Sequence, residues 1–123
     1  MNQLMKNLEE YKIWQEGLEL AETIHEVTVD FSSSGSSDVC SALNKMTYSV
    51  PCHLAEGFMM KNRKYRNGSI FMALNSLEEI HKSLLLTEQL GHVKRSHIHK
   101  IKKDINELNR KIGDLLQGQQ SVL

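Results

Sequence analysis

Aromatic residues, proline and cysteine are all scarce in this sequence of 123 residues: Phe, Trp and Tyr together make up 6%, and there are one proline and two cysteines. So few aromatics argue against a β-sandwich or β-barrel, whose strands are enriched in them. No hydrophobic run approaches the roughly 20 residues of a transmembrane helix, and the N-terminus lacks the basic and then apolar pattern of a signal peptide. We therefore expect a single domain over residues 1–123, with its core at about 8–117, in the cytoplasm and without membrane contact.

The two cysteines are expected to lie in one helix, twelve residues apart. At 1.5 Å per residue, Cys40 and Cys52 are about 18 Å from each other, which is far beyond the reach of a disulfide. We expect both to be buried, reduced thiols.

Hydrophobic residues recur at three- and four-residue steps in four segments, which predicts four amphipathic helices. These segments span about residues 8–31, 36–57, 65–90 and 96–117. Pro51 lies inside the second segment, where a proline removes a backbone hydrogen bond and clashes with the preceding turn, so a kink is predicted there. Four such segments with short connections predict an all-α fold, an antiparallel up-down-up-down four-helix bundle.

Residues that favour turns and helix caps predict where the helices end. The serine-rich segment 32–37 predicts a loop, and residues 57–68 predict an irregular junction. Gly91 is a typical helix stop, and Ser96 is a typical N-cap for the last helix. The tail 118–123 is expected to end the fold and fray.

The third segment has a second apolar side. At 100° per residue, Met72, Leu86 and Leu90 lie roughly opposite Leu77, which faces the core. A lone bundle would leave these three side chains in water. We therefore expect them to form a subunit interface in a homo-oligomer.

Charge is balanced overall but divided along the chain. Residues 1–60 contain three basic and nine acidic residues, whereas residues 61–123 contain twelve basic and six acidic ones. Two basic patches stand out, one near the junction of the second and third helices and one near the start of the last helix. They consist of Lys61, Arg63, Lys64 and Arg66, and of Lys94, Arg95, Lys100, Lys102 and Lys103.

These patches allow two interpretations beyond that of an ordinary solvated face. Clustered cations attract phosphates, and Tyr65 lies among them and can stack on a base, which predicts nucleic-acid binding. The same cations can instead pair with the acidic half of a neighbouring subunit, in an assembly module that binds no nucleic acid.

Two Glu-x-x-His pairs, Glu22 with His25 and Glu78 with His81, have the spacing found in di-iron bundle proteins. On the helical wheel only His81 falls on a core face, and Glu56 is the sole clear candidate for a further inward glutamate. A metal-binding bundle oxidase is therefore the least favoured alternative, and we expect no metal or cofactor. Nucleophile motifs and phosphate-binding glycine loops do not occur, so we expect no catalytic residues and no enzymatic activity.

Three motifs carry a resemblance to a known family: Tyr11-Lys12-Ile13-Trp14-Gln15, Ser49-Val50-Pro51-Cys52-His53-Leu54-Ala55-Glu56-Gly57 and Ala73-Leu74-Asn75-Ser76-Leu77-Glu78-Glu79. In order and spacing they resemble the four-helix-bundle family of 23S rRNA intervening-sequence proteins, over about residues 8–117. The resemblance implies a small cytoplasmic bundle without catalytic residues. In a related branch, the accessory proteins of diversity-generating retroelements, it implies a pentameric ring that binds nucleic acid and a reverse transcriptase. Glu79, in the third motif, is expected to pair across a subunit boundary.

Overall fold

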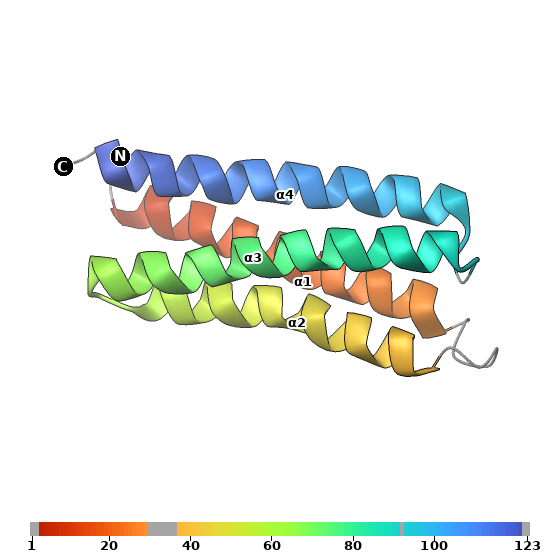
Figure 1. The fold of residues 1–123 in the computed structure, drawn as a ribbon. Helices are drawn as coiled ribbons and strands as arrows, with labels where there is room; N and C mark the ends of the chain where they lie inside the picture. The colour runs from red at the N-terminus through yellow and green to blue at the C-terminus, as the bar shows by residue number, and fades with distance from the viewer. Residues whose placement is uncertain (1–2, 30–36, 92, 122–123) are drawn as a thin grey trace.

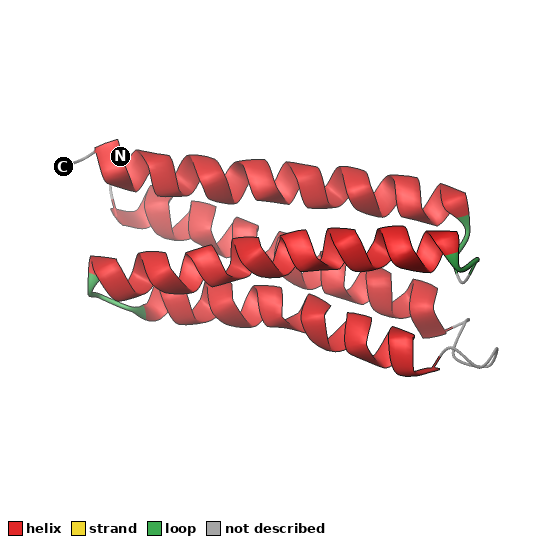
Figure 2. Cartoon of the chain, in the orientation of Figure 1, coloured by secondary structure: helices red, strands yellow, loops and turns green. Residues whose placement is uncertain are grey.

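The computed structural model describes residues 3–29, 37–91 and 93–121, and it consists of four helices (Figures 1 and 2). They are α1 (Gln3–Val29), α2 (Ser37–Met59), α3 (Arg63–Gln89) and α4 (Arg95–Ser121). No strand occurs within the described ranges. The prediction of an all-α fold of four helices is confirmed.

The helices lie side by side, and each packs against two others (Figure 1). Helices α1 and α3 both contact α2 and α4. The α2–α3 connection lies at one end of the bundle and the α3–α4 connection at the other, so these consecutive helices run in opposite directions (Figure 1). Helix α2 continues through Pro51 to Met59, and the kink at this proline stays a prediction. Among the described helices, none combines the length and apolar character needed to cross a membrane.

The core is built from leucine, isoleucine and valine at the three- and four-residue steps of each helix. Its fully buried side chains come from all four helices, and the largest are Ile24, Leu43, Val50, Leu54, Ile70, Leu77, Ile80, Leu84, Ile98, Ile101, Leu108 and Ile112. Burial of such side chains drives the association of the helices.

Gly57 brings α2 and α3 into close contact. A Cβ atom at this position would lie 2.9 Å from Cγ1 of Ile70 and 3.1 Å from the carbonyl oxygen of Arg66. The first distance is shorter than real Cβ atoms show, so any residue larger than glycine would push the two helices apart. The glycine of the second motif therefore has a packing role.

The junction predicted at residues 57–68 is shorter and more regular than expected. Helix α2 extends to Met59 and α3 begins at Arg63, so only residues 60–62 connect them. The side-chain oxygen of Asn62 accepts hydrogen bonds from the backbone N–H groups of Lys64 (3.0 Å) and Tyr65 (3.3 Å). Asn62 is thus the N-cap of α3, and this capping signal explains why the helix begins so early.

Three further boundaries were predicted, and one of them is confirmed. Gly91 has a φ of +76° and donates its backbone N–H to the carbonyl of Glu88, as expected for a helix stop. Ser96 is not the N-cap of α4, because the helix begins at Arg95 and the carbonyl of Lys94 accepts the first hydrogen bonds. The helix also continues through Gly118 to Ser121 instead of ending at this glycine. Apart from Ser37, which begins α2, the predicted loop 32–37 lies outside the described residues.

Cys52 is exposed, so the expectation that it is buried is wrong. The reason is its position on α2, two residues and therefore about 200° from the buried Val50. The side chain of Cys40 lies outside the described residues.

Candidate nucleic-acid interface

Three cations of the first patch surround the α2–α3 connection. Lys61, Arg63 and Lys64 are all exposed, and within the described parts of the chain none of them forms an ion pair. Tyr65, which follows them, is also exposed, at 66%. We call Lys61, Arg63, Lys64 and Tyr65 the basic end of the bundle.

Arg66, the fourth cation expected in this patch, does not belong to the basic end. Its side chain is buried, and Nη2 forms an ion pair with Oε1 of Glu10, which is also buried. Nη1 donates a hydrogen bond to the carbonyl of Phe58 at 3.3 Å, and the guanidinium lies 5.5 Å from the centre of the Phe58 ring. Burial lowers the pKa of Arg66 from its ordinary value, yet an arginine remains charged at neutral pH. The role of Arg66 is therefore to join α1, α2 and α3.

Sequence patterns did contain a signal for this pair. Arg66 precedes Ile70 by four residues and Ala73 by seven, so it extends the buried stripe of α3. Glu10 extends the buried stripe of α1 in the same way, three residues before Ile13. Because charged residues are seldom buried unless they are paired, opposite charges on two apolar stripes indicate a buried ion pair.

The second patch lies at the opposite end of the bundle, and three of its five cations are close to carboxylates. Arg95 and Lys102 both lie near Glu88, at 4.0 Å and 3.5 Å. Lys100 lines a groove of about 360 Å³ between α1 and α4, where four carboxylates lie: Glu16, Glu19, Asp104 and Glu107. Lys94, Lys100 and Lys103 are exposed and, among the described residues, without an ion pair. The carboxylates beside Arg95, Lys100 and Lys102 partly offset the positive charge of this patch.

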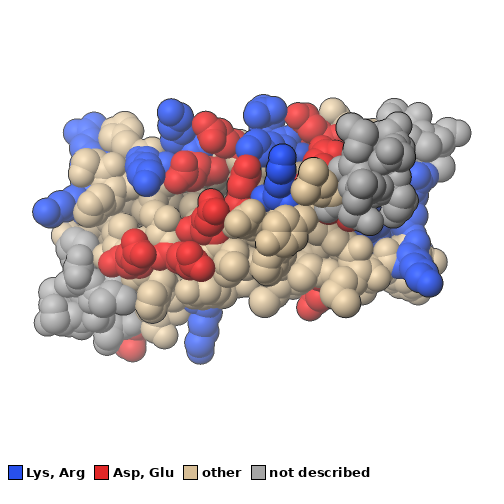
Figure 3. All heavy atoms as spheres, turned by 180° about the vertical axis from the view of Figure 1, so that it is seen from behind, with Lys and Arg blue, Asp and Glu red and all other residues tan. Residues whose placement is uncertain are grey.

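The acidic and basic halves of the sequence meet within one chain. Figure 3 shows the molecule from the side opposite to that of Figure 1. A band of acidic side chains crosses this side, below a row in which basic and acidic side chains alternate. The contact is made by α1 and α4, where Nζ of Lys111 lies 2.5 Å from Oε1 of Glu16. Part of the opposite charge of the two sequence halves is therefore neutralised within one chain.

The Glu-x-x-His pairs do not come together as a metal site. Glu22 and His25 are exposed, and the ring of His25 lies 6.4 Å from that of Tyr48. His81 is half-buried, as expected for a residue at the edge of the core. In the described portion of the chain, no three His, Cys, Asp or Glu side chains are grouped so that they could hold a metal ion.

The expected interface residues of α3 are all on the surface. Met72, Leu86 and Leu90 are 51%, 53% and 52% exposed. Glu79 is exposed too, and its carboxylate lies 3.6 Å from Nζ of Lys82 on the same helix. The structure thus leaves this apolar stripe accessible to a partner.

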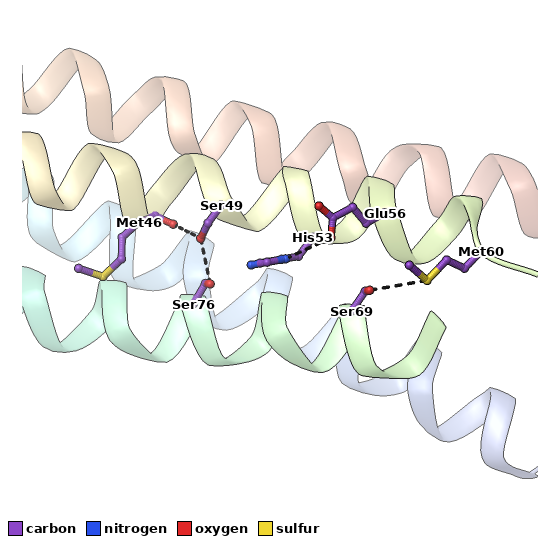
Figure 4. A network of polar contacts seen from close by, with 7 residues as sticks. All are labelled: Met46, Ser49, His53, Glu56, Met60, Ser69 and Ser76. Carbon is purple, nitrogen blue, oxygen red and sulfur yellow. Dashed lines mark hydrogen bonds and ion pairs between the residues drawn. The ribbon is translucent and has the colours of Figure 1, made fainter. Parts of the chain in front are cut away.

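Polar side chains line the contact between α2 and α3 (Figure 4). The hydroxyl of Ser49 donates to the carbonyl of Met46 at 2.5 Å and is hydrogen-bonded to Ser76 at 2.9 Å. Further along α2, Nδ1 of His53 lies 3.7 Å from Oε2 of Glu56 on the same helix. The serines of the second and third motifs therefore face each other and hold the two helices in register.

These features define a class, an all-α four-helix bundle with exposed cations at both ends. The sequence matches the 23S rRNA-intervening sequence protein family over residues 9–114. Because this match covers most of the chain, the protein belongs to that family, as the motifs indicated. No curated protein matches the sequence significantly.

Proposed function

We propose that this protein is a non-enzymatic scaffold that binds RNA, or an RNA–DNA hybrid, through its basic end. In this proposal it acts as an accessory of an rRNA intervening sequence or of a retroelement reverse transcriptase. Family membership supports an association with RNA. The observation that carries the proposal is the group of three exposed cations, Lys61, Arg63 and Lys64, beside the exposed ring of Tyr65.

Physical chemistry supports this use of the basic end. Lysine and arginine side chains gain affinity for phosphates by releasing condensed counterions, and each contact to a single strand contributes about 0.7 to the slope of log K against log salt. Three contacts correspond to a slope of about 2, which is a loss of about 20-fold in affinity between 50 and 200 mM salt. An exposed tyrosine adds a face on which an unpaired base stacks.

A pair of matched charge reversals tests the proposal. K61E/K64E changes the basic end, and K12E/K45E changes two other exposed lysines by the same charge. We expect K61E/K64E to weaken binding of a fluorescent single-stranded RNA at least tenfold at 50 mM salt, and K12E/K45E to weaken it less than threefold. If both double variants bind RNA as tightly as the unmodified protein, the basic end is not the interface.

The exposed apolar stripe of α3 favours a second function, that of a homo-oligomeric assembly module. Met72, Leu86 and Leu90 would be covered by a second copy of the chain, and the family resemblance suggests a pentamer. Light scattering of L86E is expected to give a smaller mass than that of the unmodified protein. The control L8E places the same change at an equally exposed leucine of α1. An oligomer that dissociates in L86E but binds no RNA would favour this module over the RNA-binding scaffold.

A further inference from the structure

A groove of about 270 Å³ lies between α3 and α4, on a different side of α4 from the acidic groove. Its apolar lining includes Leu77 and Ile105, which are buried, and Leu74, which is half-buried. The exposed ring of Phe71 adds an aromatic wall, at 47% exposure. The groove thus offers apolar surface that is open to solvent.

Three carboxamides surround this apolar surface. Asn75 comes from α3, and Asn106 and Asn109 come from α4. All three are exposed, and within the described residues none of them forms a hydrogen bond. Each carboxamide provides two donors and one acceptor group. Three such carboxamides beside an aromatic ring provide the donors and acceptors that could hydrogen-bond the edge of a flat polar ligand.

The charges around the groove limit what it can hold. No lysine or arginine lines it, whereas Glu78 and His81 do, and Nζ of Lys82 lies 3.9 Å from Oε1 of Glu78. The lining therefore offers no lysine or arginine to hold a phosphate or carboxylate group. The ligand that fits is uncharged and flat, with apolar faces and hydrogen-bonding edges, and nucleobases have this chemistry.

One cation of the basic end lies on the same side of α3 as the groove. Lys64 of the basic end precedes Phe71 by seven residues, so both lie on nearly the same side of α3, about 10 Å apart along its axis. A strand whose phosphates contact Lys64 can therefore reach the mouth of the groove.

We propose that the α3–α4 groove binds an unpaired nucleobase of the RNA, with Phe71 stacking on the ring and Asn106 and Asn109 hydrogen-bonding its edge. This inference rests on the proposed RNA-binding function and adds the kind of RNA that is recognised. The carboxylate of Glu78 can accept a hydrogen bond only from a base that has a donor within its reach. Cytosine has such a donor in its exocyclic amino group, and uracil lacks it. The groove therefore prefers single-stranded RNA over duplex, and cytosine over uracil.

Fluorescence anisotropy at 50 mM salt with 12-nucleotide oligo(C), oligo(U) and a duplex RNA tests this proposal. We expect N106A/N109A to weaken oligo(C) binding about tenfold and duplex binding less than twofold. F71L is expected to produce a similar loss, and F71W to retain affinity, because removal of one stacking ring changes binding by about this factor. E78Q is expected to reduce the preference for oligo(C) over oligo(U). The control Q15A removes an exposed carboxamide from α1 and is expected to change nothing.

The outcomes separate this inference from the proposed function. If the unmodified protein binds RNA, but N106A/N109A and F71L bind oligo(C) as tightly as it does, the groove proposal is overturned and the basic end stands. If the unmodified protein binds no RNA at 50 mM salt, both proposals fail. The two asparagines are exposed and without hydrogen bonds in the described parts of the chain, so their double variant still folds if F71L does not.

Discussion

Breaking the Glu10–Arg66 ion pair from one side is expected to destabilise the fold severely. In R66M the carboxylate of Glu10 stays in its buried position without its partner. Loss of one member of a buried ion pair costs about 3–5 kcal/mol. For a chain of 123 residues, each kcal/mol corresponds to about 4 °C in Tm, so the melting temperature is expected to fall by about 12–20 °C.

The double variant E10L/R66M provides the decisive comparison. Because no charge remains buried, it is expected to be more stable than either single variant, E10L or R66M. Urea denaturation followed by circular dichroism at one protein concentration measures all three free energies of unfolding. The control K64M changes an exposed cation two residues away and is expected to shift stability by less than about 0.5 kcal/mol. A loss below about 1 kcal/mol in R66M, or losses that simply add in the double variant, would refute the reasoning.

Two further predictions concern glycine and the helix cap. G57A is expected to lose about 1–3 kcal/mol in urea denaturation because its Cβ collides with Ile70, whereas G113A, with no atom within 4 Å of its Cβ, is expected to gain up to about 1 kcal/mol; equal effects would contradict the close α2–α3 contact. N62A is expected to lose about 1 kcal/mol through the N-cap of α3, while N62D retains most of the stability. An unchanged midpoint in N62A would show that the cap contributes nothing.

The helices could be predicted from the sequence because hydrophobic periodicity is a local property. Ile70, Leu77 and Leu84 repeat every seven residues along one face of α3, and no distant residue is needed to recognise them. The ends of helices were predicted less well, because they depend on single hydrogen bonds. The cap formed by Asn62 extended α3 to Arg63, and the carbonyl of Lys94 took the place expected for Ser96.

The candidate site was predicted only in part, because contacts between distant residues decide which cations remain on the surface. Lys61 and Lys64 are exposed as expected, but Arg66 is withdrawn by Glu10, which lies 56 residues earlier. The α3–α4 groove was missed altogether. Its carboxamides are unremarkable in the sequence, and only the packing of α4 against α3 brings Asn75 and Asn106 to the same groove.

The three-residue connection between α2 and α3 has a consequence for the energetics of recognition. It is held by the Asn62 cap on one side and by the Gly57 contact on the other. Ordering a free loop costs about 1–2 kcal/mol per residue in backbone entropy, and a surface that is already fixed avoids that cost on binding. In the proposed RNA complex, the basic end would therefore be a preorganised template, and the conformational adjustment would fall on the RNA strand.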